Sequence, residues 1–358
     1  MKYRHEYHAG NFADVHKHVT LLALLTALQR KDKGFLYLET HAGRGAYDLS
    51  GPSGESASGI GRLEARYRSP GAEQSVPQEI RHYLERVELL RRERGEPRFY
   101  PGSPLLAASE LRPVDRAVLI ERQPAEARAL ARALSAQAQG RARPPQVAES
   151  RAKTTLFDRD GAGPGRSPDP ALAEGRARPP QVAESRAKTT LFDRDGAGPG
   201  RSPDPALAET RARPPQVALE TADGFERLRA WLPPRERRGL TFIDPPYEES
   251  RQDFERTRHA AAEALRRFRT GLVAVWYPIK DERHTAAWHA ALAAGLDCAM
   301  LAAELSLYPR DSRVALNGSG MLILNPPYQL AERMAIWLPQ LHACLDLGHG
   351  GGASVRQL

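Results

Sequence analysis

The segment Gly239-Leu-Thr-Phe-Ile-Asp-Pro-Pro-Tyr247 decides the fold class of this 358-residue chain. Its first five residues form an apolar run that is typical of a strand buried on both faces of a parallel sheet. The two prolines end the strand, because proline lacks a backbone N–H and fixes its own φ, and each one pushes the preceding residue toward an extended conformation. We therefore expect a buried strand that delivers Asp244 into a rigid turn at its carboxyl end.

Similar apolar runs alternate with segments of helical periodicity along the chain. This alternation predicts an α/β fold with a doubly wound, mainly parallel, seven-stranded Rossmann-like sheet. The apolar run 19–28 is too short to span a bilayer and is interpreted as a buried helix. Further helices are expected at 124–134, 224–232, 253–268, 283–294 and 332–345. Strands are expected at 35–39, 117–121, 217–222, 240–244, 271–276, 299–305 and 321–325.

The predicted core is interrupted twice. Residues 1–50 hold an N-terminal segment and the first strand, residues 51–100 are expected to form a small helical insertion subdomain, and residues 101–140 and 211–358 continue the core. One helix of the insertion shows a clear 3.6-residue period, with an apolar face made of Ile80, Tyr83, Leu84, Val87 and Leu90. Its arginines are either a solvated face or, collectively, a patch for phosphates, and they are Arg81, Arg86, Arg91 and Arg92.

The second interruption is an internal duplication. Residues 141–175 recur as residues 176–210 with Gly175 replaced by Thr210, and their first eight residues appear again at 211–218. Each unit carries Pro-Pro, Gly-Ala-Gly-Pro-Gly and Ser-Pro-Asp-Pro, which interrupt helices and strands alike. We interpret residues 141–210 as a low-complexity tandem insertion that is mostly disordered. The core should tolerate it, because each doubling of a flexible loop costs only about 0.6 kcal/mol.

Composition limits the class of partner and compartment. The formal net charge of +8 and the pI near 9.6 agree with a polyanionic partner, although basic proteins without such a partner exist. Most of this charge belongs to the core, because each duplicated unit nearly balances its basic and acidic residues. Cys298 and Cys344 show no metal-ligand or redox spacing and fit a reducing compartment, so we expect a cytoplasmic protein.

Residues at the strand ends indicate a ligand site, because open α/β sheets bind ligands beyond the carboxyl ends of their strands. Gly43 permits a tight turn after the first strand, but the third glycine of the dinucleotide fingerprint is missing, which disfavours a nicotinamide site. The next strands end in Glu121, an acceptor for ribose hydroxyls, in Asp223-Gly224 and in Asp244. In strand order they describe a nucleoside-like cofactor beside the Asp244 turn. Each acidic residue alone could equally be a helix cap or a solvated turn residue.

The turn suits methyl transfer to an exocyclic amino group of a base. Such an amine is a poor nucleophile, because its lone pair is delocalised into the ring, and acceptors must hold it while the nitrogen becomes tetrahedral. Asp244 and the carbonyl of Pro245 could be these acceptors, and the Tyr247 ring could stack on an extruded base. The alternative is that the segment is only a strand and a turn. A similar segment, Asn325-Pro-Pro-Tyr328, follows the seventh expected strand and is interpreted as a strand-ending turn.

Taken together, these residues resemble the class I S-adenosylmethionine-dependent methyltransferases, and among them the 23S ribosomal RNA adenine-N6 methyltransferases of the J type. The similarity covers nearly the whole chain outside residues 141–210. This chain departs from the family pattern at Arg44, inside the glycine turn, and in the duplication just before the strand that leads to Asp223. The motifs that carry the resemblance are Tyr3-Arg-His5, His8-Ala-Gly-Asn-Phe-Ala-Asp-Val-His-Lys-His18, Thr40-His-Ala-Gly43, Tyr100-Pro-Gly-Ser-Pro104, Ala222-Asp-Gly-Phe225, Ile243-Asp-Pro-Pro-Tyr-Glu248 and Trp276-Tyr-Pro278.

The resemblance implies S-adenosyl-L-methionine as cofactor and methylation of the N6 amine of a specific adenine in 23S ribosomal RNA, by base flipping and in-line transfer. It implies that Asp244 is catalytic, within a turn that includes Pro245 and Tyr247, and that Tyr3, with Arg4, lies near the target base. We expect a monomer. The residues expected to contact the cofactor are His18, His41, Gly43, Ser103, Glu121, Asp223 and Gly224.

Other functions remain open at this level. DNA adenine-N6 methylation and protein glutamine methylation use similar turns, and the basic charge together with the insertion also fits an RNA-binding relative without catalytic activity. A metal site is disfavoured, because methyl transfer to nitrogen needs no metal and no carboxylate or cysteine framework accompanies the N-terminal histidines His5, His8, His16 and His18.

Overall fold

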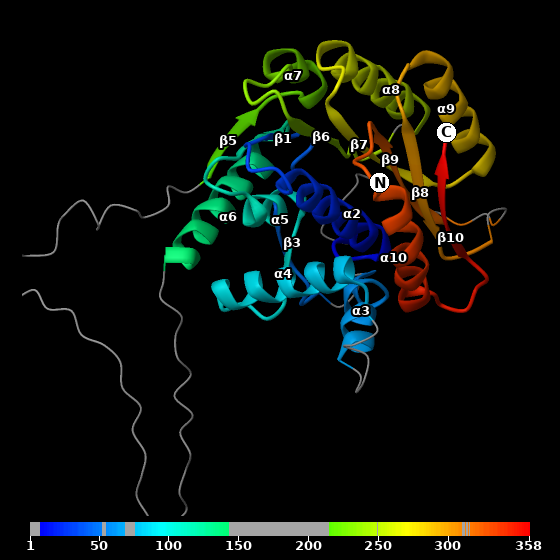
Figure 1. The fold of residues 1–358 in the computed structure, drawn as a ribbon. Helices are drawn as coiled ribbons and strands as arrows, with labels where there is room; N and C mark the ends of the chain where they lie inside the picture. Colours follow the sequence, from blue (N-terminus) through cyan, green and yellow to red (C-terminus); the bar gives the residue numbers. More distant parts are fainter. Residues whose placement is uncertain are drawn as a thin grey trace, which may run out of the picture. The chain divides into compact units, whose positions relative to one another are not determined.

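The computed structural model describes residues 8–51, 55–68, 76–142, 215–248, 250–309, 312, 314 and 316–358. In this part of the chain eight strands form one sheet in the order β10-β8-β9-β7-β6-β1-β4-β5, with helices on both faces (Figure 1). Six strands run in one direction, and β9 and β10 run against them. The protein therefore has a mixed α/β architecture built on a large, mostly parallel sheet.

The strand that carries the Asp244 turn lies near the middle of this sheet. All five residues of β6 are buried, as the apolar run predicts, and β6 pairs in parallel with β1 and β7. A separate two-stranded sheet is made of β2 (Ala46–Asp48) and β3 (Phe99–Pro101). The strands of the main sheet are β1 (Leu36–Glu39), β4 (Arg116–Glu121), β5 (Gln216–Thr221), β6 (Gly239–Ile243), β7 (Leu272–Ile279), β8 (Met300–Ser306), β9 (Gly318–Leu324) and β10 (Gly352–Gln357).

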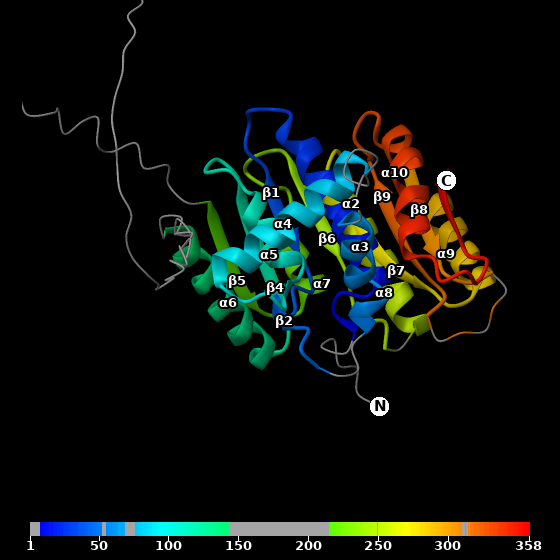
Figure 2. The same ribbon diagram turned by 90° about the horizontal axis from the view of Figure 1, so that it is seen from below.

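Alternate residues of the strands feed two apolar layers. In β1, Tyr37 belongs to the layer under α2, α4, α5, α6 and α10, whereas Leu36 and Leu38 belong to the layer under α7, α8 and α9 (Figures 1 and 2). This alternation is the two-residue period of a strand covered on both faces. The helices are α2 (Phe12–Gln29), α3 (Ile60–Tyr67), α4 (Gln78–Arg94), α5 (Ser103–Glu110), α6 (Pro124–Ala142), α7 (Gly224–Trp231), α8 (Ser250–Arg267), α9 (Glu282–Gly295) and α10 (Leu330–Leu345), with a 3-10 turn, η1, at Glu55–Ala57.

The main sheet has one strand more than the seven expected from sequence. β10 pairs antiparallel with β8, with Gly352 opposite Ser306 and Gln357 opposite Leu301. It lies at the edge of the sheet, and all its residues are half-buried or exposed. A strand in this position does not need apolar side chains on both faces. Its sequence, Gly-Ala-Ser-Val-Arg-Gln, accordingly has no apolar run, and the strand was not predicted.

The described residues between 51 and 100 pack directly on the core. The expected apolar face of α4 is buried against α2, and these helices belong to the same compact unit as the sheet. Two arginines expected on a solvated face have partners inside the protein instead. Arg91 is only 7% exposed and donates from Nε to the Phe99 carbonyl at 2.8 Å, and Arg86 pairs with Glu110. They do not form a free phosphate-binding patch, because protein acceptors already hold them.

The duplicated residues 141–210 lie outside the described part of the chain, apart from the last two residues of α6. The third copy of the repeated opening is partly described: Gln216, Val217 and Ala218 begin β5 and pair in parallel with Arg116, Ala117 and Val118 of β4. The apolar run 19–28 is part of the buried helix α2, as expected. Among the helices described, none has the length and apolar character needed to cross a membrane.

Candidate active site

The carboxyl ends of β1, β4, β5 and β6 meet at one edge of the sheet. Backbone bonds tie the loops that follow: the Thr40 N–H donates to the Phe242 carbonyl at 3.1 Å, and the Ala42 N–H donates to the Ile120 carbonyl at 2.9 Å. Because β1 lies between β4 and β6, chain order reverses at this edge. It is the topological switch point at which open α/β sheets bind ligands.

The glycine turn after β1 has the tight conformation that its sequence predicts. Gly43 and Gly45 adopt φ of 62° and 73°, a region that side-chain-bearing residues rarely occupy. The Gly43 N–H donates to Glu121 Oε2 at 2.8 Å, and Oε1 of the same carboxylate accepts from the Gln123 N–H at 2.7 Å. Burial raises the pKa of Glu121. The Glu121 carboxylate is thus fixed at the end of β4, facing the glycine turn.

Asp223 and Gly224 join α7 to the end of β1. Asp223 caps α7, because its Oδ1 accepts from the Phe225 N–H at 3.0 Å, while Oδ2 accepts from Arg256 at 3.1 Å. A Cβ on Gly224 would lie 1.9 Å from the Thr40 carbonyl oxygen, so no larger residue fits here without backbone movement. Asp223 therefore has a structural role as a helix cap at the place where a cofactor contact is expected.

His41 precedes the glycine turn, and Ser103 follows Gly102, whose N–H donates to the Gly45 carbonyl in that turn at 2.7 Å. The His41 ring meets the Phe225 ring edge-on at a centroid distance of 4.7 Å, and burial lowers the pKa of His41 to about 4, so its imidazole is neutral at pH 7. The Ser103 hydroxyl donates to the buried Glu39, the last residue of β1, and burial raises the pKa of Glu39 to about 8. Glu39 was not among the predicted site residues, although an acidic residue at the end of a buried strand was the signal that could have found it.

His18 lies inside α2 and is 1% exposed. Its Nδ1 is 2.9 Å from the Tyr100 hydroxyl, which in turn lies 3.1 Å from the Tyr83 hydroxyl. The structure thus brings the His8–His18 motif together with the Tyr100–Pro104 motif, two segments that are far apart in sequence. A contact between His18 and the cofactor stays a prediction.

Asp244 is held by a buried lysine that sequence reasoning missed. Nζ of Lys17 lies 2.7 Å from Asp244 Oδ2 and 2.8 Å from Asp14 Oδ1, and the three side chains are at most 12% exposed. Burial alone would lower the pKa of Lys17, but the two carboxylates outweigh it and raise that pKa well above its usual value. The available signal was the pair Asp14 and Lys17, three residues apart on the helix turn that precedes the apolar run 19–28.

The expected stacking surface on Tyr247 is not open in the structure. Tyr247 is 2% exposed, its hydroxyl donates to the Trp276 carbonyl at 2.8 Å, and its ring packs against Phe254 at a centroid distance of 4.8 Å. A base cannot stack on a ring that neighbouring rings already cover. The neighbouring Trp276 ring is only partly buried, and Nζ of Lys17 lies 5.5 Å from its centroid.

The second Pro-Pro-Tyr segment lies at the opposite edge of the sheet. Leu324, at the end of β9, pairs with Val273 near the start of β7, because the two strands are antiparallel. Asn325 uses its side-chain amide to donate to the carbonyls of Arg269 and Gly271 at 2.8 and 2.9 Å. The interpretation of this segment as a strand-ending turn is confirmed.

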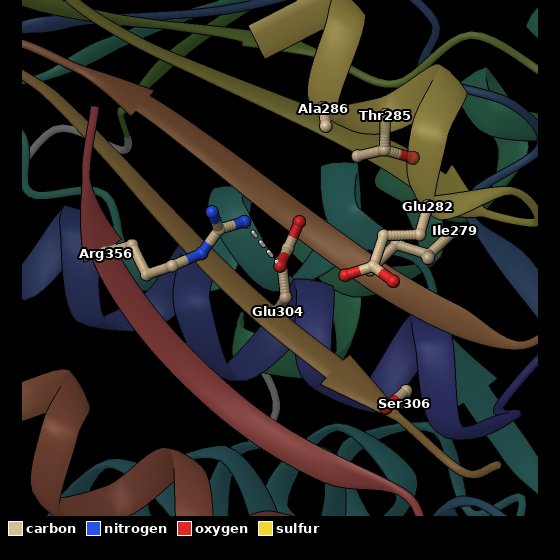
Figure 3. A pocket seen from close by; sticks show the side chains of 7 residues that line it. All are labelled: Ile279, Glu282, Thr285, Ala286, Glu304, Ser306 and Arg356. Carbon is tan, nitrogen blue, oxygen red and sulfur yellow. Dashed lines mark hydrogen bonds and ion pairs between the residues drawn. The ribbon is translucent and has the colours of Figure 1, made fainter. Parts of the chain in front are cut away.

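A small cavity of about 50 Å³ lies away from Asp244, between α9, β8 and β10 (Figure 3). Two charged side chains of its lining pair with each other: Glu304 accepts from Arg356 at 2.9 Å, and it also accepts from the Tyr277 hydroxyl at 3.1 Å. In sheet order β7 and β9 separate β8 from the strand that carries Asp244. None of the predicted site residues lines this cavity.

Two predicted site residues, Tyr3 and Arg4, fall outside the described residues, as does His5 of the N-terminal histidine cluster. The other three histidines have different partners, since His8 pairs with Glu55, His16 with Ser319 and His18 with Tyr100. In the described ranges, no group of three or more histidine, cysteine or acidic side chains is arranged to hold a metal ion.

A mostly parallel sheet with this strand order, a glycine turn after β1 and an Asp-Pro-Pro turn after β6 together define a protein of the Rossmann-like methyltransferase class. Comparison with known sequences narrows the class. The sequence model of a family described as "Ribosomal RNA large subunit methyltransferase D, RlmJ" matches residues 32–154 and 200–357, and the chain belongs to this family.

Two relatives agree with this assignment, and a solved structure shares the fold. A protein of Escherichia coli (strain K12) named "Ribosomal RNA large subunit methyltransferase J" is 32% identical, over 99% of this chain and 98% of its own length. A protein of the same name from Haemophilus influenzae is 30% identical, over 95% of this chain and 92% of its own. The crystal structure of protein LPL1258 from Legionella pneumophila matches with a TM-score of 0.67 at 26% identity, over 98% of each chain.

Proposed function

We propose that this protein transfers a methyl group from S-adenosyl-L-methionine to the N6 amine of a specific adenine in 23S ribosomal RNA. The observation that carries the proposal is the Asp244 turn at the switch point of the sheet, with its carboxylate held by Lys17. The family description and the names of the two relatives support the large-subunit ribosomal RNA as substrate, and the net charge of +8 suits a polyanion. On this proposal the protein acts as a monomer in the cytoplasm, on RNA from which the adenine is flipped out.

Asp244 and Pro245 are the acceptors for the target amine. The Lys17 ammonium group donates to Asp244 Oδ2, whereas Asp244 Oδ1 has no hydrogen-bond partner among the described residues. Oδ1 and the Pro245 carbonyl can therefore accept the two N–H groups of the amine, and Pro246 contributes no N–H that would compete. Two fixed acceptors favour a tetrahedral nitrogen whose lone pair is available for attack. Lys17 restrains the carboxylate so that these acceptors are in place before the substrate arrives.

S-adenosyl-L-methionine, when bound, supplies a sulfonium methyl group as the electrophile. Residues at the switch point fit a cationic nucleoside of this kind. Glu121 offers carboxylate oxygens to ribose hydroxyls, and the neutral His41 does not repel a sulfonium. Glu39 is a buried carboxyl group at the end of β1, and an incoming ammonium group would favour its ionised form and donate to it. Gly43, Ser103, Asp223, Gly224 and His18 are the further contacts proposed for the cofactor.

We place the target base against Trp276 rather than against Tyr247. The Trp276 ring is half-buried and adjoins Lys17, which holds Asp244, whereas Tyr247 is covered on both sides. Stacking of a base on an aromatic ring contributes about 1–3 kcal/mol, enough to offset part of the cost of flipping the base out. Tyr247 then serves to hold the backbone of Trp276 through its hydroxyl. Tyr3 and Arg4 remain proposed substrate contacts.

Methylation assays on three substrates test this function. The purified protein and labelled S-adenosyl-L-methionine should modify 23S ribosomal RNA, with the methyl group mapped by mass spectrometry to N6 of one adenine. Asp244→Ala should abolish transfer while isothermal titration still detects cofactor binding. Transfer to duplex DNA or to release-factor protein, but not to RNA, would contradict the substrate. Failure of the unmodified protein to bind the cofactor would favour the binding-only alternative, and a fully active Asp244→Ala variant would contradict the catalytic assignment.

A further inference from the structure

His16 and Ser319 belong to a buried polar chain that this mechanism leaves unused. His16 and Ser319 are both 0% exposed, and Nδ1 of His16 lies 3.0 Å from Ser319 Oγ. The same Oγ accepts from the Trp276 indole N–H at 2.9 Å. The chain His16–Ser319–Trp276 therefore runs from α2 through β9 to β7 and ends at the ring beside Lys17 and Asp244.

His16 gains nothing else in the fold from being polar. Its Nε2 is buried and has no hydrogen-bond partner among the described residues, and burying an unpaired nitrogen costs stability. A leucine of similar volume would avoid that cost, because Phe12, Ala13 and Val19, one turn away on α2, are apolar. The ring nitrogen Nδ1, by contrast, is hydrogen-bonded to Ser319.

Trp276 is restrained on three sides by this arrangement. Ser319 accepts from its indole N–H, the Tyr247 hydroxyl donates to its backbone carbonyl, and the Lys17 ammonium lies near its ring. Without the acceptor, the indole N–H would lose its partner inside the protein and the ring could rotate about its side-chain bonds. A ring that must stack on a flipped base needs one fixed orientation, because misplacement weakens both stacking and alignment.

We propose that His16 and Ser319 are positioning residues that fix the Trp276 indole as one wall of the site for the target base. This inference rests on the proposed function, since it assigns a purpose to a chain of hydrogen bonds that ends at the proposed base site. Burial lowers the pKa of His16 to about 3, so the chain stays neutral and intact across the physiological pH range. His16 orients the Ser319 hydroxyl, and Ser319 holds the indole.

Four variants separate positioning from packing. Ser319→Ala removes the acceptor of the indole N–H, and His16→Leu removes the partner of Ser319 at similar volume. His16→Asn returns a polar atom close to the former Nδ1. His289→Leu is the matched control, because His289 is also buried, at 4% exposed, and neither of its ring nitrogens has a hydrogen-bond partner in the described residues. His289 lies in α9, and its ring contacts Tyr277 and Trp288.

We expect Ser319→Ala and His16→Leu to raise KM for 23S ribosomal RNA about five- to tenfold, the ratio that corresponds to the loss of one buried hydrogen bond. Affinity for S-adenosyl-L-methionine should stay unchanged, His16→Asn should recover most of the loss, and His289→Leu should leave KM unchanged. If Ser319→Ala and His16→Leu lower only the melting temperature, as His289→Leu does, the proposal is overturned.

Fluorescence gives a test that does not depend on activity. The emission of Trp276 is isolated by subtracting the spectrum of each protein carrying Trp276→Phe from the spectrum of its parent. Ser319→Ala and His16→Leu should shift this emission to the red and make it easier to quench with acrylamide. If the unmodified protein methylates no RNA, the proposed function fails while this measurement still decides whether the chain orders the ring. An unshifted spectrum in both variants overturns the positioning role.

Discussion

Lys17 connects the buried ion pairs of α2 to the chemistry of the turn. Replacing it with methionine would remove the ammonium group that bridges two buried carboxylates, Asp14 and Asp244. Removing one partner of a buried ion pair typically costs about 3–5 kcal/mol. We predict that Lys17→Met lowers stability by this order in urea unfolding, and that it lowers methyl transfer at saturating cofactor by at least about 100-fold, because Asp244 loses its restraint.

Asp14→Asn is the control for this prediction, because it removes one charge and keeps the bond between Lys17 and Asp244. Its loss of transfer should be no more than about tenfold. A Lys17→Met protein that turns over like the unmodified enzyme would show that Asp244 acts without the lysine.

The titration of buried groups makes stability depend on pH in two opposing ways. Burial lowers the pKa of His16 from 6.5 to about 3 and that of His41 to about 4, so the folded protein binds fewer protons than the unfolded chain in these windows. The two histidines contribute fully to the free energy of unfolding above about pH 6.5. This contribution is lost as the pH falls toward their pKa values in the folded protein. Glu39, with a folded pKa of about 8, acts in the opposite sense, and its contribution is lost as pH rises from 4.5 to 8.

Single variants separate the contributions of His16 and Glu39 to the pH dependence of stability. Between pH 6.5 and 5, His16→Leu should flatten the dependence of unfolding free energy on pH by about 1 kcal/mol per pH unit. Glu39→Gln should gain stability relative to the unmodified protein as pH rises from 5 to 8. Urea unfolding at several pH values measures both differences. Curves for His16→Leu and the unmodified protein that stay parallel would mean that His16 is protonated in the folded state.

The sequence indicates the part of the candidate site that lies where the expected strands end. Glu121 ends the buried strand β4, Asp244 follows the buried strand β6, and Asp223 lies just beyond the exposed strand β5, so parallel topology brings them to one end of the sheet. The parts that it cannot indicate depend on tertiary packing. Whether Tyr247 or Trp276 exposes its ring is decided by Phe254 and the Tyr247 hydroxyl bond, which are set only when α8 and β7 are in place. Lys17 in isolation is one charge on a helix, and its burial between two carboxylates is a property of the fold.

At the level of elements, the junction between β1 and α7 tolerates no added atom. Gly224 packs against the Thr40 carbonyl, and a Cβ there would meet it at 1.9 Å, a contact with backbone that cannot rotate away. We predict that Gly224→Ala lowers the free energy of unfolding by about 2 kcal/mol or more and weakens cofactor binding, because α7 and its cap Asp223 must shift. Thermal unfolding and cofactor titration measure the two effects.

Gly295→Ala supplies the comparison for the same chemical change in an open position. Gly295 ends α9, and an added Cβ there meets nothing within 4 Å. Alanine is the better helix former by roughly 0.5–1 kcal/mol, so this variant should be neutral or slightly more stable. If both alanine variants behaved alike, the close packing at Gly224 would not matter for the site.

Strands with an apolar run and helices with a clear 3.6-residue period can be predicted from the sequence. Elements that lack such a pattern cannot. β6 and β9 are buried along their whole length; the apolar run indicates all of β6, but only residues 321–324 of β9, which begins with Gly-Ser-Gly. β10 has no such run, because an edge strand against β8 leaves its side chains half-buried or exposed. The short α5 was also missed, since Ser103-Pro104 marks its start but its eight residues are too few to show a helical period.

At the scale of the whole molecule, the position of β5 in the main sheet explains why the fold tolerates the duplication. The insertion enters between α6 and β5, and β5 is the edge strand of the main sheet. The family model leaves residues 155–199 unmatched, and all of these lie within the duplicated residues. An edge strand can accept a long connection, because only one of its sides pairs with a neighbour and the connection need not cross the sheet.

Removing the duplication tests whether the protein needs it. Deleting residues 141–210 joins Gly140 to Arg211, and the repeat itself restores the Arg-Ala pair that ends α6, because residues 211–212 repeat residues 141–142. The connection shrinks from residues 143–215 to residues 213–215, which should raise the free energy of unfolding by about 2–3 kcal/mol through the lower entropy cost of closing the loop. Deleting residues 141–175 alone only halves the connection and should add about 0.6 kcal/mol.

Cofactor affinity and KM for RNA should stay unchanged in both shortened proteins, because Gln216 still begins β5 and most of the positive charge lies in the core. Isothermal titration, methylation kinetics and urea unfolding measure these quantities, and a shortened protein that folds but loses cofactor binding would show that the duplicated units support the Asp223 side of the site.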